Sequence, residues 1–116
     1  MYPVSILIHV SDVELAATWY GRAFPGAVQL SASAEHVLLQ VGSIALEIVK
    51  ADSKVGSGKQ GTVVYWQVES WAVAIERLEA LEAKLYRGPL RLEGIQMMCQ
   101  FEDPFGNLIG IRGKAT

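Results

Sequence analysis

The spacing of hydrophobic positions changes along the first part of the chain. Over residues 4–10 apolar and polar side chains alternate, which predicts a β-strand with one apolar face. Over residues 13–24 apolar positions recur at helical spacing, and the Pro-Gly pair at 25–26 ends this predicted helix. Ser11 and Glu14 form the sequence pattern of a capping box, with Ser11 as the predicted N-cap. The chain therefore begins with a strand followed by a helix.

Short strand-like runs separated by turn residues follow this helix. Gly42 and Ser43 predict a tight hairpin turn between the last two runs. Residues 51–61 are polar, rich in Gly and Ser and without periodicity, so they are predicted to form a linker. The predicted strands before this linker cover residues 27–30, 36–41 and 44–49.

The same order of elements recurs after the linker. Residues 62–68 are typical of a strand, Ser70 is the predicted N-cap, and residues 71–81 show the apolar stripe of an amphipathic helix. Two copies of a βαβββ unit, residues 1–50 and 62–116, therefore predict an α+β fold. One helix covers only one face of each sheet, which leaves the other face open. The remaining predicted strands cover residues 84–92, 96–102 and 108–112.

Composition limits the class of protein. The chain has 116 residues, which predicts one domain, and 51% of them are hydrophobic, as in a globular core. The net charge is −2 without a basic run, so nucleic acid is not an expected partner. Polar residues interrupt every apolar run, so neither a leader segment nor a membrane span is expected. Cys99 is the single cysteine, which excludes an internal disulfide and favours a cytoplasmic location.

Three features resemble one known family. The first strand ends in Val10-Ser11-Asp12 and leads into a helix with Trp19-Tyr20, a second strand and helix repeat this order, and residues 101–109 contain an Asp-Pro-x-Gly-Asn turn. Together they resemble the vicinal oxygen chelate superfamily, which includes glyoxalase I, bleomycin-resistance proteins, extradiol dioxygenases and fosfomycin-resistance enzymes. The resemblance covers essentially the whole chain. It implies two βαβββ modules that form a cup-shaped mixed sheet with the helices on its outer face, usually in a homodimer.

The resemblance also bears on metal binding. Metal-dependent members of that family take one ligand from each of four strands, and the matching positions here are Ser5, Glu47, Val63 and Gly110. Glu47 alone carries a carboxylate or an imidazole, and one such donor cannot hold a divalent ion that needs several protein ligands. These departures from the family pattern predict no metal and no cofactor, with Glu47 as the one remaining candidate metal ligand.

The predicted strand phases direct several polar side chains toward the face away from the helices. Glu47 is expected to pair with Arg112 or a neighbouring hydroxyl group, or to be wetted by water in the cup. If it is unpaired in a dry site, it is a candidate acid or base. His9 either bonds to backbone at the rim or contacts a ligand, and His36 is expected to be a surface residue. The predicted ligand-binding residues are Ser5, His9, Glu47, Tyr65, Gln67, Met98, Gln100 and Arg112.

These observations favour a metal-independent protein that binds a small organic molecule in its cup, similar in type to the bleomycin-resistance proteins. No catalytic residue is predicted in this interpretation. The first alternative is a metal-dependent lyase, isomerase or dioxygenase with an atypical ligand set, such as Glu47 with His9, a dimer partner and water. The second is a non-catalytic interaction domain whose cup is filled by its own side chains. The sequence leaves the ligand unidentified.

Overall fold

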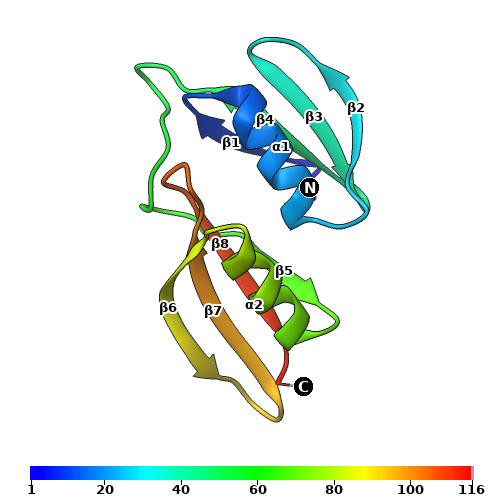
Figure 1. Ribbon diagram of the computed structural model, residues 1–116, viewed down its shortest axis with the longest axis vertical. Coiled ribbons are helices and arrows are strands. Elements are labelled where there is room, and N and C mark those ends of the chain that lie inside the picture. The colour runs from blue at the N-terminus through cyan, green and yellow to red at the C-terminus, as the bar shows by residue number, and fades with distance from the viewer. Residues whose placement is uncertain (116) are drawn as a thin grey trace. The chain divides into compact units, whose positions relative to one another are not determined.

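The computed structural model describes residues 1–115 and consists of two compact units, which divide between Ser57 and Gly58 (Figure 1). Each unit has the element order strand, helix and three strands. Two four-stranded mixed sheets and two helices make this an α+β protein built from two βαβββ modules. The predicted fold class is confirmed.

In the first unit, β1 (Ser5–Val10) leads into α1 (Val13–Ala23). β2 (Val28–Ala32), β3 (His36–Val41) and β4 (Ile44–Lys50) complete the sheet in the spatial order β1-β4-β3-β2. β1 and β4 are parallel, whereas the other neighbouring strands are antiparallel. Figure 1 shows α1 lying across one face of this sheet. The opposite face has no helix over it within this unit.

Alternating residues of the central strands build the core of the first unit. Leu46 and Ile48 of β4 are completely buried, and Val37 and Leu39 of β3 are buried beside them. The residues between them point to the opposite, helix-free face, as the pleat of a strand requires. Tyr20 is the largest buried side chain of α1, with 1% of its surface exposed. The hydrophobic alternation in the sequence thus decides which face α1 covers.

The N-cap of α1 differs from the predicted one. Asp12 is the cap, and its Oδ1 accepts a hydrogen bond from the backbone N–H of Leu15 at 3.1 Å. The carbonyl of Ser11 instead accepts a hydrogen bond from Nζ of Lys50. A carboxylate is as good a cap acceptor as a hydroxyl, and its charge is favourable at the helix N-terminus. The prediction of Ser11 as the N-cap is therefore wrong by one residue.

The second unit repeats this arrangement with β5 (Tyr65–Val68), α2 (Trp71–Ala80), β6 (Lys84–Arg91), β7 (Gln96–Glu102) and β8 (Leu108–Lys114). Its spatial order is β5-β8-β7-β6, with β5 and β8 parallel. Ser70 caps α2 as predicted, accepting from the N–H of Val73 at 3.3 Å. Leu78 is the buried residue of α2, whereas Trp71 is only half-buried. The buried side chains of the sheet are Cys99, Phe101, Ile109 and Ile111.

β5 is shorter than the strand predicted over residues 62–68. Its ladder with β8 begins at Tyr65, whose Cα partner is Gly110. One further hydrogen bond, from the N–H of Gly110 to the carbonyl of Val64, precedes this ladder at 2.9 Å. Val63 therefore lies before the strand, two residues ahead of the first paired position. The other predicted strands and both helices agree with the structure to within two residues at either end.

The Asp-Pro-x-Gly-Asn turn between β7 and β8 is organised by one buried carboxylate. Asp103 is 3% exposed, and its Oδ1 accepts from the N–H groups of Phe105 and Asn107, both at 2.8 Å. Asn107 in turn accepts a hydrogen bond from the N–H of Gly58 at 2.9 Å. The turn therefore fixes both the β7–β8 register and the beginning of the second unit.

Neither helix among residues 1–115 has the length and apolar character needed to cross a bilayer.

Candidate functional site

The helix-free face of the first unit carries three of the predicted site residues. The pairing of β1 with β4 sets Ser5 beside Ala45 and His9 beside Val49, and Glu47 lies between these two positions. Ser5, His9 and Glu47 are all partly buried. The structure therefore places them on one face, as the strand phases predict. Their role in ligand binding stays a prediction.

Glu47 has a partner that the sequence analysis did not assign. His36 of β3 lies 2.7 Å away, measured from its Nε2 to Oε1 of Glu47. The side chains are 38% and 23% exposed, respectively, so water reaches both. The expected exposure of His36 agrees with this, whereas its contact with Glu47 is one that the sequence did not predict. The expected pairing of Glu47 with Arg112 stays a prediction.

The position of His36 follows from the β3–β4 hairpin. Val41 and Ile44 pair across the predicted Gly42-Ser43 turn, and each step back along β3 matches one step forward along β4. His36 is thereby opposite Val49, one side-chain position from Glu47 on the same face. This register was available from the sequence once the turn was assigned. Turn assignment and hairpin register together are therefore the sequence signal that brings His36 beside Glu47.

His9 lies at the end of β1, close to a turn that follows β4. Asp52 begins this turn, and its Oδ1 accepts from the backbone N–H groups of Lys54 and Val55, both at 2.8 Å. The hydrogen bond from Val55 and then that from Lys54 hold the pKa of Asp52 below its ordinary value of 3.8, and the charge of His9 adds to this effect. His9 is therefore near a fixed carboxylate.

The helix-free face of the second unit is organised around a glycine. A Cβ added to Gly110 would come within 2.6 Å of Cγ and Cδ2 of Tyr65, so the ring of Tyr65 lies directly over this residue. The Tyr65 hydroxyl accepts a hydrogen bond at 2.9 Å from Nε2 of Gln100, which lies on the far side of β8. The ring thus reaches from β5 across β8 to β7. Gly110 is required because any side chain there would collide with it.

Arg112 lies two residues beyond Gly110 on the same face. Its Cα partners are Gln67 on β5 and Met98 on β7, so an amide and a thioether flank the guanidinium-bearing residue. Gln67 and Arg112 are exposed, whereas Met98 is half-buried. Tyr65, Gln67, Met98, Gln100 and Arg112 therefore share one sheet face, as predicted. Their contact with a ligand stays a prediction.

The donor groups do not fit the metal site that the fold family implies. Glu47 and Gly110 are equivalent positions in the two units, because Glu47 pairs with Leu7 and Gly110 pairs with Tyr65. The ring of Tyr65 occupies the space where a side chain at position 110 would begin. Val63 has no donor group and precedes its strand. Within residues 1–115 no three His, Cys, Asp or Glu side chains are grouped so as to hold a metal ion.

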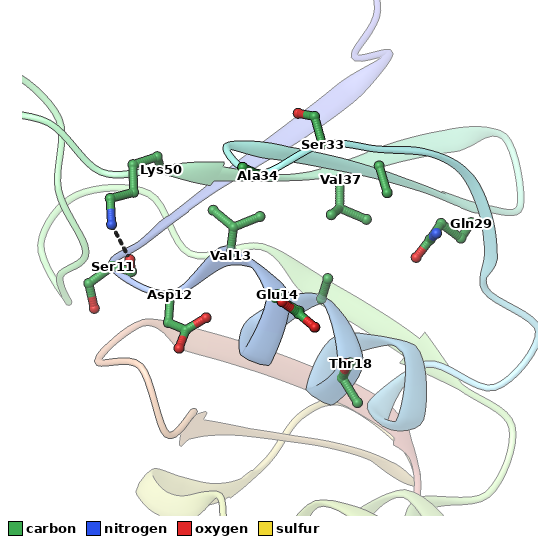
Figure 2. Close-up of a pocket in the computed structure, with 12 residues that line it drawn as sticks. Ser11, Asp12, Val13, Glu14, Thr18, Gln29, Ser33, Ala34, Val37 and Lys50 are labelled. Atoms are coloured by element: carbon green, nitrogen blue, oxygen red, sulfur yellow. Dashed lines mark hydrogen bonds between the residues drawn. The ribbon is translucent and has the colours of Figure 1, made fainter.

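A large cavity lies elsewhere in the first unit, on the helix side of the sheet. Its volume is about 780 Å³. Figure 2 shows it between α1 and the β2–β3 hairpin, with the Lys50–Ser11 hydrogen bond at its rim. The N-cap Asp12 and Glu14 of α1 line one side of it, and Ser33 and Val37 line the other. None of the predicted site residues lines it. It is a groove at the helix–sheet seam, separate from the residues assembled on the helix-free faces.

Two βαβββ modules with polar groups on helix-free sheet faces define a protein of the vicinal oxygen chelate architecture. The chain belongs to the Glyoxalase/Bleomycin resistance protein/Dioxygenase superfamily, whose family model matches residues 3–111. This match covers most of the chain and bears out the resemblance found in the sequence. A search of curated proteins found no match.

Solved structures support the same fold. A glyoxalase-related enzyme from Fulvimarina pelagi has a TM-score of 0.80 and 20% identity, with 98% of this chain and 88% of that chain covered. A glyoxalase/bleomycin resistance protein/dioxygenase family enzyme from Burkholderia phytofirmans PsJN has a TM-score of 0.79 and 16% identity, covering 95% and 96%. The fosfomycin resistance protein FosX from Listeria monocytogenes has a TM-score of 0.75 and 15% identity, covering 99% and 93%. At these identities the likeness shows the fold.

Proposed function

We propose that this chain binds a small organic molecule without a metal ion, on the helix-free faces of its sheets. The observation that carries this proposal is the ring of Tyr65 over Gly110, where a Cβ would come within 2.6 Å of the ring. A metal-dependent relative needs a donor side chain at this position. Here an aromatic ring takes its place, so the face is better suited to contact with an organic molecule.

The other groups on these faces support the same function. Glu47 and His36 form a polar pair beside Leu7 and Leu38, which are the strand neighbours of Glu47. The Tyr65 hydroxyl offers a second polar group on the other sheet. Apolar surface with a few oriented polar groups is typical of small-molecule sites. A role in sequestration or sensing needs no further chemistry.

The metal content of the purified protein tests this proposal. We expect less than 0.1 equivalent of Zn, Mn, Ni or Fe by plasma mass spectrometry after purification without chelators, on the order expected for adventitious binding. Titration with each ion is expected to leave the melting temperature unchanged, because an ion without a specific site on the folded chain does not stabilise it. A stoichiometric ion that the protein holds through dialysis would overturn the proposal.

A ligand screen is the second test of the proposed function. Glu47→Ala and Tyr65→Ala are each expected to weaken a ligand found by screening by a few-fold to about a hundredfold, the range for lost hydrogen bonds to neutral and charged groups. Glu76→Ala on α2 is the matched control, because Glu76 is exposed and lies outside the sheet faces. If neither test substitution changes the affinity, the assignment of these faces as the site is wrong.

A metal-dependent enzyme is the second candidate function. The observation that favours it is the convergence of His36 and Glu47, since imidazole and carboxylate are both common metal ligands. Two donors are fewer than the three protein ligands of a typical catalytic zinc site. The variants His36→Asn and Glu47→Gln separate the two candidates. Metal that copurifies with the wild-type chain and is lost from both variants would favour the enzyme.

A further inference from the structure

The helix-free face of the second sheet is basic. β-strand register places two rows of side chains across it in the order β5-β8-β7-β6. The first row runs from Tyr65 over Gly110 to Gln100 and Arg87, and the adjacent row begins with Gln67 and Arg112. The basic residues of this face are Lys84, Arg87, Arg112 and Lys114, and its acidic residue is Glu102.

The single acid of this face does not neutralise the two arginines. Glu102 lies at one end of β7, where its Oε2 is 3.3 Å from Nζ of Lys59. Within the described residues of the second unit, neither Arg87 nor Arg112 forms an ion pair, and both are exposed. A guanidinium group presents a planar set of donors that matches a carboxylate or a phosphonate. The guanidinium groups of Arg87 and Arg112 are therefore available to bind an anion.

Arg112 is the arginine placed to bind an organic anion, because of the residues beside it. Gln67 is its Cα partner on the neighbouring strand, and adjacent strands lie about 4.8 Å apart, so the amide and the guanidinium can reach one head group. The ring of Tyr65 lies over Gly110, two positions along β8 from Arg112. Met98 borders Arg112 on the other side. An anionic head at Arg112 would thus have aromatic and apolar surface next to it.

We infer that the ligand of this protein is a small organic acid with an apolar, preferably aromatic, body. Its carboxylate or phosphonate group is bound by Arg112 and Gln67, and its body lies against the ring of Tyr65. This inference rests on the proposed small-molecule function and adds the charge class of the ligand. Arg87, beside Gln100, supplies a second cation for acids that carry two anionic groups.

The test uses four probes that share one phenyl ring and differ in charge. Benzoate and phenylphosphonate are anionic, benzamide is neutral and benzylamine is cationic. We expect the anionic probes to shift the backbone amide NMR signals of Gln67, Met98 and Arg112 in the full chain. Benzamide and benzylamine are expected to bind at least tenfold more weakly, because they lack the charge-assisted hydrogen bonds.

Arg112→Gln is expected to weaken benzoate binding by about 10- to 100-fold, which is the range for a hydrogen bond to a charged group. Arg112→Lys keeps the charge but loses the planar fork, so an intermediate affinity is expected. Arg91→Gln is the matched control: it removes the same charge from an exposed residue whose Cα partner is Met97, on the other face of the sheet. Its affinity for benzoate should equal that of the wild type.

The outcomes separate this inference from the proposed function. Equal benzoate affinity of Arg112→Gln and Arg91→Gln overturns the assignment to Arg112. Binding of benzamide or benzylamine as tight as that of benzoate overturns the acidic class, while small-molecule binding itself stands. If none of the four probes binds at 20 mM, on the order of the weakest affinities that matter for fragments, the aromatic-acid class is rejected. The proposed function is then decided separately, by the metal content and the ligand screen.

Discussion

The ring of Tyr65 lies over Gly110, and the two residues are Cα partners in the parallel pairing of β5 and β8. From there the Tyr65 hydroxyl reaches Gln100 on β7, so one side chain spans three strands. The contact accounts for the glycine at a position where metal-dependent relatives carry a ligand. It also makes the two residues energetically dependent on each other.

Gly110→Ala is expected to destabilise the protein by about 1–3 kcal/mol, because the new Cβ overpacks against the Tyr65 ring. In a Tyr65→Ala background the same substitution should cost less than about 1 kcal/mol, since the ring is gone. Urea unfolding of the four chains measures this coupling. Additive effects of the two substitutions would contradict the close contact.

The His36–Glu47 pair is expected to contribute little to stability. Both side chains reach solvent, and exposed pairs contribute about 0.2–1 kcal/mol. A double-mutant cycle with His36→Asn and Glu47→Gln should therefore give a coupling free energy in this range. A coupling above about 2 kcal/mol would mean that the pair is a structural element of the sheet and would argue against its availability to a ligand.

Asp103→Ala is expected to cost about 2–4 kcal/mol. The substitution leaves the N–H groups of Phe105 and Asn107 without their 2.8 Å acceptor at a buried position, and each lost bond costs about 1–2 kcal/mol. Asp103→Asn keeps one acceptor oxygen and should recover part of this loss. Chemical denaturation of both variants provides the measurement. An unchanged stability of Asp103→Ala would show that the turn does not need this carboxylate.

Cys99 is expected to make stability depend on alkaline pH. Burial raises the pKa of its thiol from 9.0 to about 11, so the folded protein keeps a proton that the unfolded chain releases in this interval. The neutral thiol therefore makes its full contribution to the free energy of unfolding below pH 9. This contribution declines as pH rises toward 11, by up to about 1.4 kcal/mol per pH unit.

Comparison with Cys99→Ala isolates this effect from other groups that titrate in the same range. The free energy of unfolding of the wild type should fall more steeply between pH 9 and 11 than that of the variant. A thiol reagent at pH 8 should label Cys99 only after denaturation, because the side chain is 2% exposed. Rapid labelling of the native protein would contradict the burial on which the prediction depends.

The sequence alone determined the order of elements, both modules and the faces of the strands that carry the predicted site residues. Alternation of apolar residues is a local property of the pleat, so Leu46 and Ile48 identified the helix side of β4 and left Glu47 on the other side. Helix spacing and Ser70 located α2 in the same way. The resemblance then supplied the equivalence of Glu47 and Gly110.

The tertiary structure decided which side chains meet. His36 reaches Glu47 and Tyr65 reaches Gln100 because neighbouring strands bring together residues that are 11 and 35 positions apart in the chain. Strand phase gives a side chain its face but not its rotamer, so it does not reveal that the ring of Tyr65 lies over Gly110. Contacts between strands depend on register and side-chain torsions, which only the folded chain fixes.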